Sequence, residues 1–114
     1  MTTRTVTYTI FMLLRTMPDW LRLKRDERSA IAQEAFSFAL KDGKVAFSYH
    51  DAEAFSARAT DVAVFKTPDL YTYYTMVERL RDSKLFTVPY FEVVDIIPTI
   101  EDGYRQFEED EARA

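Results

Sequence analysis

The sequence predicts an α+β fold of the ferredoxin-like type, an antiparallel four-stranded sheet with two helices on one face. The first observation behind this prediction is that strand-like and helix-like segments follow one another in the order βαββαβ. The second is that a chain of 114 residues can bury about two-thirds of its unfolded surface, which is enough for one core. We therefore expect one domain over residues 1–107 and an acidic, frayed tail over residues 108–114.

The first half of the pattern is a strand followed by a long helix. Residues 5–14 are rich in Thr, Val, Tyr, Ile and Phe, which favour a pleated strand. Pro18 and Asp19 interrupt it, and from Arg25 apolar residues recur at helical spacing. Gly43 is expected to end the helix, because glycine accepts the left-handed conformation. The predicted apolar stripe consists of Ile31, Ala32, Ala35, Phe36, Phe38 and Ala39.

The second half contains two strands, a helix and a last strand. Residues 44–53 alternate like a half-buried strand, and the β-branched segment 61–66 predicts the next. Thr67 is expected to cap the second helix, with Pro68 at its first position. The buried stripe of that helix would be Leu70, Tyr73, Tyr74, Val77 and Leu80. Residues 90–97 predict a strand that Pro98 ends, and Ile100, Tyr104 and Phe107 suggest a short terminal helix.

The predicted sheet has apolar residues on both of its faces. An antiparallel sheet with one face in water should present a polar row there, yet the first and fourth strands are apolar in both rows. We expect a second copy of the chain to cover this face, so that two sheets pair as a dimeric α+β barrel. The alternative is a cover formed by a loop or the terminal helix of the same chain.

Composition excludes several classes of function. Lys and Arg number 15 against 19 Asp and Glu, and the net charge of −4 argues against nucleic acid and anionic membranes as partners. The absence of cysteine removes disulfides and thiol chemistry, and two glycines cannot form a phosphate-binding loop. With one histidine, we expect no metal site and no cofactor. No apolar run is long enough for a membrane span, so we predict a cytoplasmic protein.

One candidate site is the predicted hairpin between the second and third strands. It contains Tyr49, His50, Asp51, Glu53, Arg58 and Asp61. This mixture could hold or activate a small anionic or phenolic ligand. The alternative is a hairpin end that an arginine–carboxylate bridge holds together. Strand alternation places Tyr49 and Asp51 on one face and His50 on the other.

A second candidate is the acidic pair within the last strand. Simple alternation puts Glu92 and Asp95 on opposite faces, which excludes a paired-carboxylate site from this strand alone. The carboxylate that points inward would be poorly hydrated and would have a raised proton affinity. It could act as a general base, or it could bridge the strand to a partner subunit.

These features predict a homodimeric protein that binds a small aromatic or polyketide-like molecule. The candidate catalytic residues are His50, Asp51 and Glu92, and the candidate ligand-binding residues are Tyr8, Phe47, Tyr49, Arg58, Tyr90 and Phe91. Their enzymatic task would be proton abstraction from the ligand. The competing hypothesis is a structural module that self-associates through its sheet and leaves no cavity.

Several blocks of the sequence also resemble a known family. They are 8–13 (YTIFML) with 20–21 (WL), 51–58 (DAEAFSAR), 80–82 (LRD), 89–98 (PYFEVVDIIP) and 101–104 (EDGY). Together they resemble the darcynin family of small bacterial proteins, whose function is unknown and which implies no catalytic residues. Dimeric α+β barrels as a class include cofactor-independent monooxygenases, decarboxylases, isomerases and haem enzymes, an analogy of fold only. Haem is the least supported, because His50 is the sole imidazole.

Overall fold

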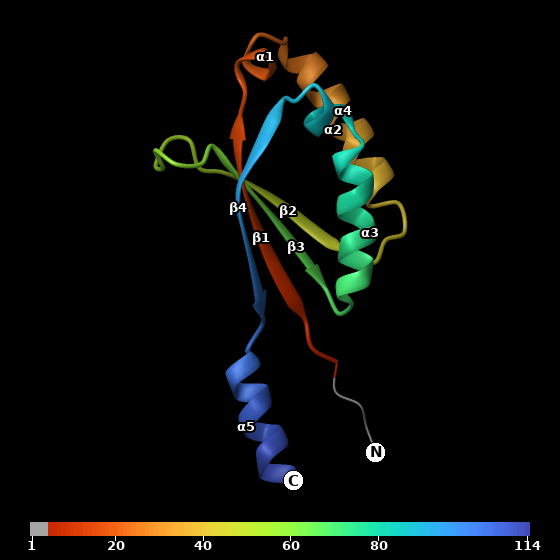
Figure 1. Ribbon diagram of the computed structural model, residues 1–114, viewed down its shortest axis with the longest axis vertical. Coiled ribbons are helices and arrows are strands. Elements are labelled where there is room, and N and C mark those ends of the chain that lie inside the picture. Colours follow the sequence, from red (N-terminus) through yellow and green to blue (C-terminus); the bar gives the residue numbers. More distant parts are fainter. Residues whose placement is uncertain (1–4) are drawn as a thin grey trace.

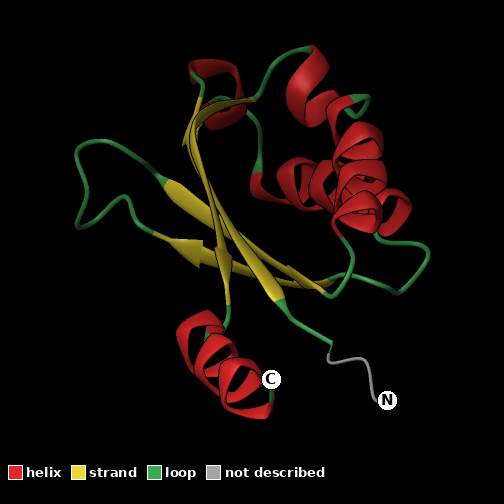
Figure 2. Ribbon diagram, turned by 60° about the horizontal axis from the view of Figure 1, so that its bottom comes forward, coloured by secondary structure: helices red, strands yellow, loops and turns green. Residues whose placement is uncertain are grey.

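A computed structural model describes residues 5–114 and confirms the α+β, ferredoxin-like prediction. Four antiparallel strands form one sheet in the order β2-β3-β1-β4, with α2 and α3 packed on the same face (Figures 1 and 2). The elements are β1 (Tyr8–Thr16), α1 (Pro18–Leu21), α2 (Arg25–Ala39), β2 (Ala46–Asp51), β3 (Asp61–Thr67), α3 (Leu70–Arg81), α4 (Lys84–Thr87), β4 (Phe91–Ile100) and α5 (Gly103–Arg113). We call the side of the sheet that bears α2 and α3 the helix face, and the other side the open face.

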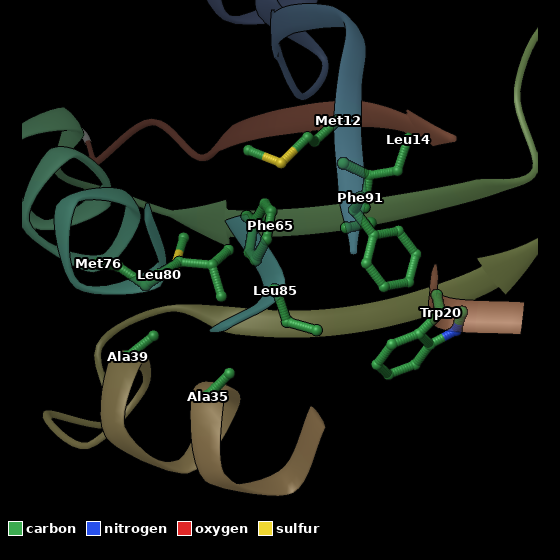
Figure 3. Packing of buried hydrophobic residues seen from close by; sticks show 11 residues of the cluster. Met12, Leu14, Trp20, Ala35, Ala39, Phe65, Met76, Leu80, Leu85 and Phe91 are labelled. Carbon is green, nitrogen blue, oxygen red and sulfur yellow. The ribbon is translucent and has the colours of Figure 1, made fainter. Parts of the chain in front are cut away.

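The hydrophobic core lies between the helix face and the helices (Figure 3). Phe65 of β3 is fully buried at its centre, where α3 contributes Met76 and Leu80. Strand alternation explains the arrangement, because Phe65 and Ala63 point to the helix face while Val62 and Val64 point to the open face. The same row begins at the buried carboxylate of Asp61 and ends at the buried hydroxyl of Thr67.

The second long helix, α3, starts differently from the prediction. Asp69, not Thr67, is its N-cap, and its carboxylate accepts a hydrogen bond of 3.0 Å from the Tyr71 backbone N–H. The Thr67 hydroxyl accepts from the Asp69 N–H at 3.2 Å, and Pro68 precedes the cap. Threonine and aspartate are both common N-cap residues. The residue that caps the helix is the one whose side chain reaches the first free backbone N–H groups, and here that residue is Asp69.

The predicted apolar stripes are wider than the surfaces that the helices bury. Phe38 of α2 is 52% exposed, and Leu70 and Tyr74 of α3 are also exposed. Ala35 and Ala39 are buried, because small side chains allow α2 to approach its neighbours closely. Each helix therefore buries only part of its predicted apolar stripe.

Two predictions for the C-terminal part are wrong in their boundaries. Pro98 does not end β4, which continues to Ile100 and pairs Pro98 with Ile10. Proline is tolerated there because β4 is an edge strand, where a backbone N–H can be missing. The terminal helix α5 extends to Arg113 and is longer than the short helix predicted.

Helix α5 leads away from the end of β4 and does not lie over the sheet (Figure 1). Its apolar side chains remain in solvent, with Tyr104 77% exposed and Phe107 59% exposed. The terminal helix therefore does not cover the open face in this chain. None of the helices within residues 5–114 is both long and apolar enough to cross a membrane.

Candidate functional site

A cavity of about 530 Å³ lies between the helix face and α2, near the ends of β2 and β3. Its apolar wall comes from both layers, since α2 supplies Ala32 and Phe36 and the sheet supplies Phe47 and Phe91. Trp20 of α1 and Leu85 of α4 complete this wall. The short helices that flank the sheet therefore close one end of the cavity.

The aromatic rings of the wall pack against one another and against the core. Phe36 and Phe47 stack with centroids 4.5 Å apart, and Phe47 stacks on Phe65 at 5.3 Å. At the other side, Trp20 meets Phe91 at 5.0 Å. Contacts of this kind fix the ring planes, so the cavity has a preformed aromatic surface.

The polar end of the cavity consists of Tyr49 and three carboxylates. Asp51 of β2 lies directly opposite Asp61 of β3, and Glu53 follows in the loop. Asp61 is only 4% exposed, and its Oδ2 accepts a hydrogen bond of 2.7 Å from the Thr60 hydroxyl.

Burial sets the proton affinities at this end. It raises the pKa of Asp61 above the ordinary value of 3.8; hydrogen bonds from Thr60 and Tyr49 oppose this effect, whereas the charges of Glu53 and Asp51 add to it. Burial also raises the pKa of the Tyr49 hydroxyl, with the Asp61 carboxylate as the next cause. Tyr49 is therefore a neutral phenol at physiological pH, beside a carboxylate that holds its proton more tightly than usual.

Among residues 5–114, Arg28 of α2 is the one basic side chain in the wall of this cavity. Its Nε donates to the Trp20 carbonyl at 3.0 Å, and its Nη2 donates to the Leu21 carbonyl at 2.8 Å. Within residues 5–114, no ion pair joins a basic side chain to Asp51, Glu53 or Asp61. The cavity consequently carries an excess of negative charge.

The structure brings together four of the predicted catalytic and ligand-binding residues, along with Glu53 and Asp61 of the candidate hairpin site. Phe47, Tyr49, Asp51 and Phe91 all line the cavity. Tyr8 lies at the far end of β1, where it pairs with Thr67 and Ile100. Tyr90 packs its ring on Trp20 at 5.4 Å and is not part of the cavity wall.

His50 lies on the open face, away from the cavity. It is paired with Val62, and its Nε2 lies 2.9 Å from the Ser48 hydroxyl in an open hollow that Phe11 also lines. The prediction that His50 and Asp51 point to opposite faces agrees with the strand register. His50 and Asp51 therefore do not form one site.

Glu92 and Asp95 share the open face, and the prediction of opposite faces is wrong. The register between β1 and β4 shifts at Leu13 and Leu14, so that Asp95 pairs with Leu13 while Glu92 pairs with Arg15. A bulge of this kind inserts one residue and reverses the alternation beyond it. Both carboxylates are partly exposed, so neither is the poorly hydrated acid that simple alternation predicted.

Arginines pair with both carboxylates of the open face. Arg15 Nη1 contacts Glu92 Oε1 at 2.6 Å, and Arg58 Nη2 contacts Asp95 Oδ2 at 3.2 Å. Arg15 also donates to the Arg58 carbonyl at 2.6 Å. The arginine–carboxylate bridge expected within the hairpin thus connects the β2–β3 loop to β4 instead. Arg58 and Glu92 contribute nothing to the cavity wall.

Sequence reasoning missed several residues of the cavity. The sequence indicated that Phe36 is buried, because this residue belongs to the predicted apolar stripe of the first long helix. Trp20 lies in one of the blocks that resemble the known family, and nothing in the sequence indicates that it lines a cavity. Nothing in the sequence indicates that Arg28 lines the cavity, because the groups that hold its side chain are backbone carbonyls of another helix.

The fold and this cavity define an α+β protein of the ferredoxin-like type, with a pocket between the sheet and its first long helix. The chain belongs to the darcynin family, described as a domain of unknown function, whose model matches residues 2–114. The resemblance to this family that the sequence indicated is thus confirmed.

Two relatives illustrate the family. The chain is 45% identical over 89 residues to Darcynin 1 of Acinetobacter baumannii, an alignment that covers 77% of this chain and 99% of the relative. It is 52% identical over 65 residues to Darcynin of Chromobacterium violaceum, covering 57% of this chain and 82% of the relative.

Solved structures share the fold at low sequence identity. A haem-binding protein from Thermus thermophilus matches with a TM-score of 0.74 and 17% identity over 92% of this chain. Chlorite dismutase from Candidatus Nitrospira defluvii, in complex with imidazole, matches with a TM-score of 0.71 and 14% identity over 83% of this chain. The chain spans 45% and 40% of the length of these two solved chains. At such identity the likeness describes the fold alone.

Proposed function

We propose that this protein binds a small aromatic or polyketide-like molecule in the cavity between the sheet and α2. The observation that carries the proposal is an aromatic-walled cavity of about 530 Å³ with polar groups at one end. Ligand pockets of proteins have volumes of roughly 300–1,000 Å³, with apolar walls and a few polar groups that orient the ligand. The cavity meets each of these conditions.

Haem is not part of the proposal, although one protein of similar fold is described as haem-binding. The sole histidine of the chain, His50, lies on the open face, and its Nε2 contacts Ser48. The cavity therefore offers no imidazole to an iron atom. The residues of the cavity are therefore better suited to an organic molecule without an iron centre than to haem.

An enzymatic version of the proposal rests on Asp51 together with Asp61. Asp51 lines the cavity, where its carboxylate could take a proton from an activated C–H or phenol of a bound ligand. Of the predicted catalytic residues, His50 and Glu92 lie on the other face of the sheet. The double variant Asp51→Asn with Asp61→Asn would abolish such an activity, and unchanged turnover would contradict it.

The binding proposal is tested by filling the cavity. Ala32 of α2 lines it, whereas Ala30 of the same helix is exposed and lies outside its wall. A panel of aromatic compounds would be screened by thermal shift, because a ligand of the folded state raises the melting temperature. Compounds that stabilise the wild type and Ala30→Trp should not stabilise Ala32→Trp. Equal stabilisation of both variants would contradict the proposal.

The proposal includes a homodimer formed through the open face. Phe11, Leu13 and Val62 form an apolar centre there, beside Ile97, which is 44% exposed. The charged side chains Arg15, Arg58, Glu92 and Asp95 lie at one end of this face. An apolar centre with a polar rim is typical of protein interfaces. A second copy of the chain would cover this centre, which α5 leaves open (Figure 1).

Adjacent isoleucines of β4 provide a matched test of the dimer. Ile97 pairs with Phe11 on the open face, and Ile96 pairs with Met12 on the helix face, yet their exposed fractions are similar at 44% and 42%. Sedimentation velocity should show a dimer for the wild type and for Ile96→Asp, but a monomer for Ile97→Asp. A monomeric wild type at micromolar concentration would contradict this part of the proposal and favour a monomeric binding protein.

A further inference from the structure

We infer that the cavity selects organic ammonium ligands, in which an aromatic ring carries a protonated amine that lies between Tyr49 and the carboxylates of Asp51 and Asp61. The inference rests on the proposed function, because it names the ligand class of the same cavity. Three features of the cavity carry it: an uncompensated buried carboxylate, the charge balance of the wall, and the arrangement of the aromatic rings.

Asp61 is a buried acid that accepts a hydrogen bond from the Thr60 hydroxyl but has no basic partner among residues 5–114. Its side chain is almost inaccessible and lines the cavity. Asp51 is its direct cross-strand neighbour, so two acids face each other on the same side of the sheet. A buried carboxylate without a counter-ion is unfavourable, and like charges directly opposite each other add to that cost. A ligand cation would supply the missing counter-ion.

The charge balance of the wall disfavours an anionic ligand. Asp51, Glu53 and Asp61 contribute three acidic groups, whereas Arg28 contributes the single basic group. The guanidinium of Arg28 is already held by the carbonyls of Trp20 and Leu21. A ligand carboxylate would thus meet repulsion from three acids, with one basic group partly engaged elsewhere.

The aromatic wall suits a cation as well as an apolar ring. Tyr49 lines the cavity together with Asp51 and Asp61, and its ring adjoins that of Phe47 at 6.3 Å with the planes tilted by 59°. The negative faces of aromatic rings attract ammonium groups within about 6 Å, most strongly when the groups are desolvated. Phe36 and Phe91 line the remaining wall, which can hold the ring of the ligand.

A metal ion does not fit the same carboxylates. Among the residues that the structure describes, no three Asp, Glu or His side chains converge closely enough to hold one. A cation such as Ca²⁺ requires 6–8 oxygen ligands at about 2.3–2.6 Å, more than these acids bring together. An organic ammonium group is larger and donates its hydrogen bonds to separate acceptors.

A matched set of three probes tests the inference. Isothermal titration calorimetry would compare 2-phenylethylammonium, neutral 2-phenylethanol and anionic phenylacetate, which have the same ring and nearly the same size. We expect the ammonium compound to bind about tenfold more tightly than the alcohol, or better, and phenylacetate not to bind. In Asp61→Asn, the ammonium compound should bind about tenfold more weakly than to the wild type, with the alcohol unchanged. Asp95→Asn, a change on the open face, is the control and should behave as the wild type.

The outcomes separate this inference from the proposed function. Equal or tighter binding of the alcohol or of phenylacetate overturns the ammonium preference and leaves the cavity as a binding site. Failure of all three probes to bind also overturns it, and the proposed function is then decided by the Ala32→Trp screen. If Asp61→Asn is unfolded by circular dichroism, Asp51→Asn takes its place, because Asp51 lines the same cavity on the neighbouring strand. If the folded variant that is measured still prefers the ammonium compound over the alcohol as strongly as the wild type does, the inference is contradicted.

Discussion

Asp51 of β2 and Asp61 of β3 lie directly opposite each other on the helix face, at the open end of the hydrophobic core. Cross-strand pairs of like charge destabilise a sheet. Both residues line the cavity, and Asp61 is buried there. In the proposed site, an ammonium ligand would offset this repulsion as the counter-ion of the two carboxylates.

The stability of the protein should depend on pH through Asp61. Because the pKa of Asp61 is raised in the folded state, the folded protein binds this proton more tightly than the unfolded chain does. Stability should therefore fall as pH rises from the ordinary value of 3.8 through the raised pKa, relative to Asp61→Asn, which cannot ionise. Urea unfolding of both proteins across this range measures the difference. A difference that does not grow with pH would contradict the prediction.

The Asp61→Asn variant should also lower the pKa of Tyr49. Burial is the main cause of the raised pKa, and the Asp61 charge is the next, so the value should decrease but stay above 10.0. Phenolate absorbance measured against pH gives the result. The contribution of Tyr49 is isolated by subtracting the titration of Tyr49→Phe in each background.

Phe65→Ala should be strongly destabilising. The ring is fully buried at the centre of the core, where it contacts Phe47 and Tyr73. Replacing a buried phenylalanine with alanine costs about 3–5 kcal/mol of unfolding free energy. Phe55→Ala is the control, because Phe55 is 93% exposed and its loss should change stability by less than about 0.5 kcal/mol. Denaturant unfolding measures both, and similar values for the two variants would contradict the description of the core.

The ion pair of Arg15 and Glu92 should contribute little to stability in the monomer. Both side chains are nearly half exposed, at 43% and 45%, and exposed pairs contribute about 0.2–1 kcal/mol. A double-mutant cycle with Arg15→Ala and Glu92→Ala measures the coupling. The more exposed pair of Arg22 and Asp19, at the same distance of 2.6 Å, is the comparison and should give a smaller value. A much larger coupling for Arg15 would indicate that a partner subunit buries the pair.

Asp69→Ala should weaken the start of α3. The Asp69 carboxylate accepts hydrogen bonds of 3.0 Å from the Tyr71 N–H and from the Thr72 hydroxyl. Loss of an N-cap of this kind costs about 1 kcal/mol, whereas Asp69→Asn keeps an acceptor and should be nearly neutral. Thermal and urea unfolding distinguish the two variants, and equal losses would contradict the capping role.

The order of strands and helices could be predicted from local patterns. Alternation of apolar residues identified β2, β-branched residues identified β3, and helical spacing identified α2 and α3. The same local reasoning placed Tyr49 and Asp51 together on one face and His50 on the other. Family membership was also visible in the sequence, through blocks such as residues 51–58.

Two features of β4, the face on which its carboxylates lie and the point at which the strand ends, depend on how it pairs with β1 and could not be predicted from local patterns. One shift of register between β1 and β4 placed Glu92 and Asp95 on the same face, because a single extra residue reverses the alternation of side chains. The edge position of β4 allowed the strand to continue through Pro98. Neither property belongs to the residues of β4 alone, since both depend on the neighbouring strand.

The sequence by itself determined the fold class, the family and the polar residues of the β2–β3 hairpin, because short-range spacing encodes them. Only the tertiary structure decided which of those residues share a cavity. Trp20 and Arg28 reach it from separate helices, and Asp61 becomes a buried acid only when the layers close over it. The desolvation that raises the pKa of Asp61 is a property of the packed layers and exists in no segment of the chain on its own.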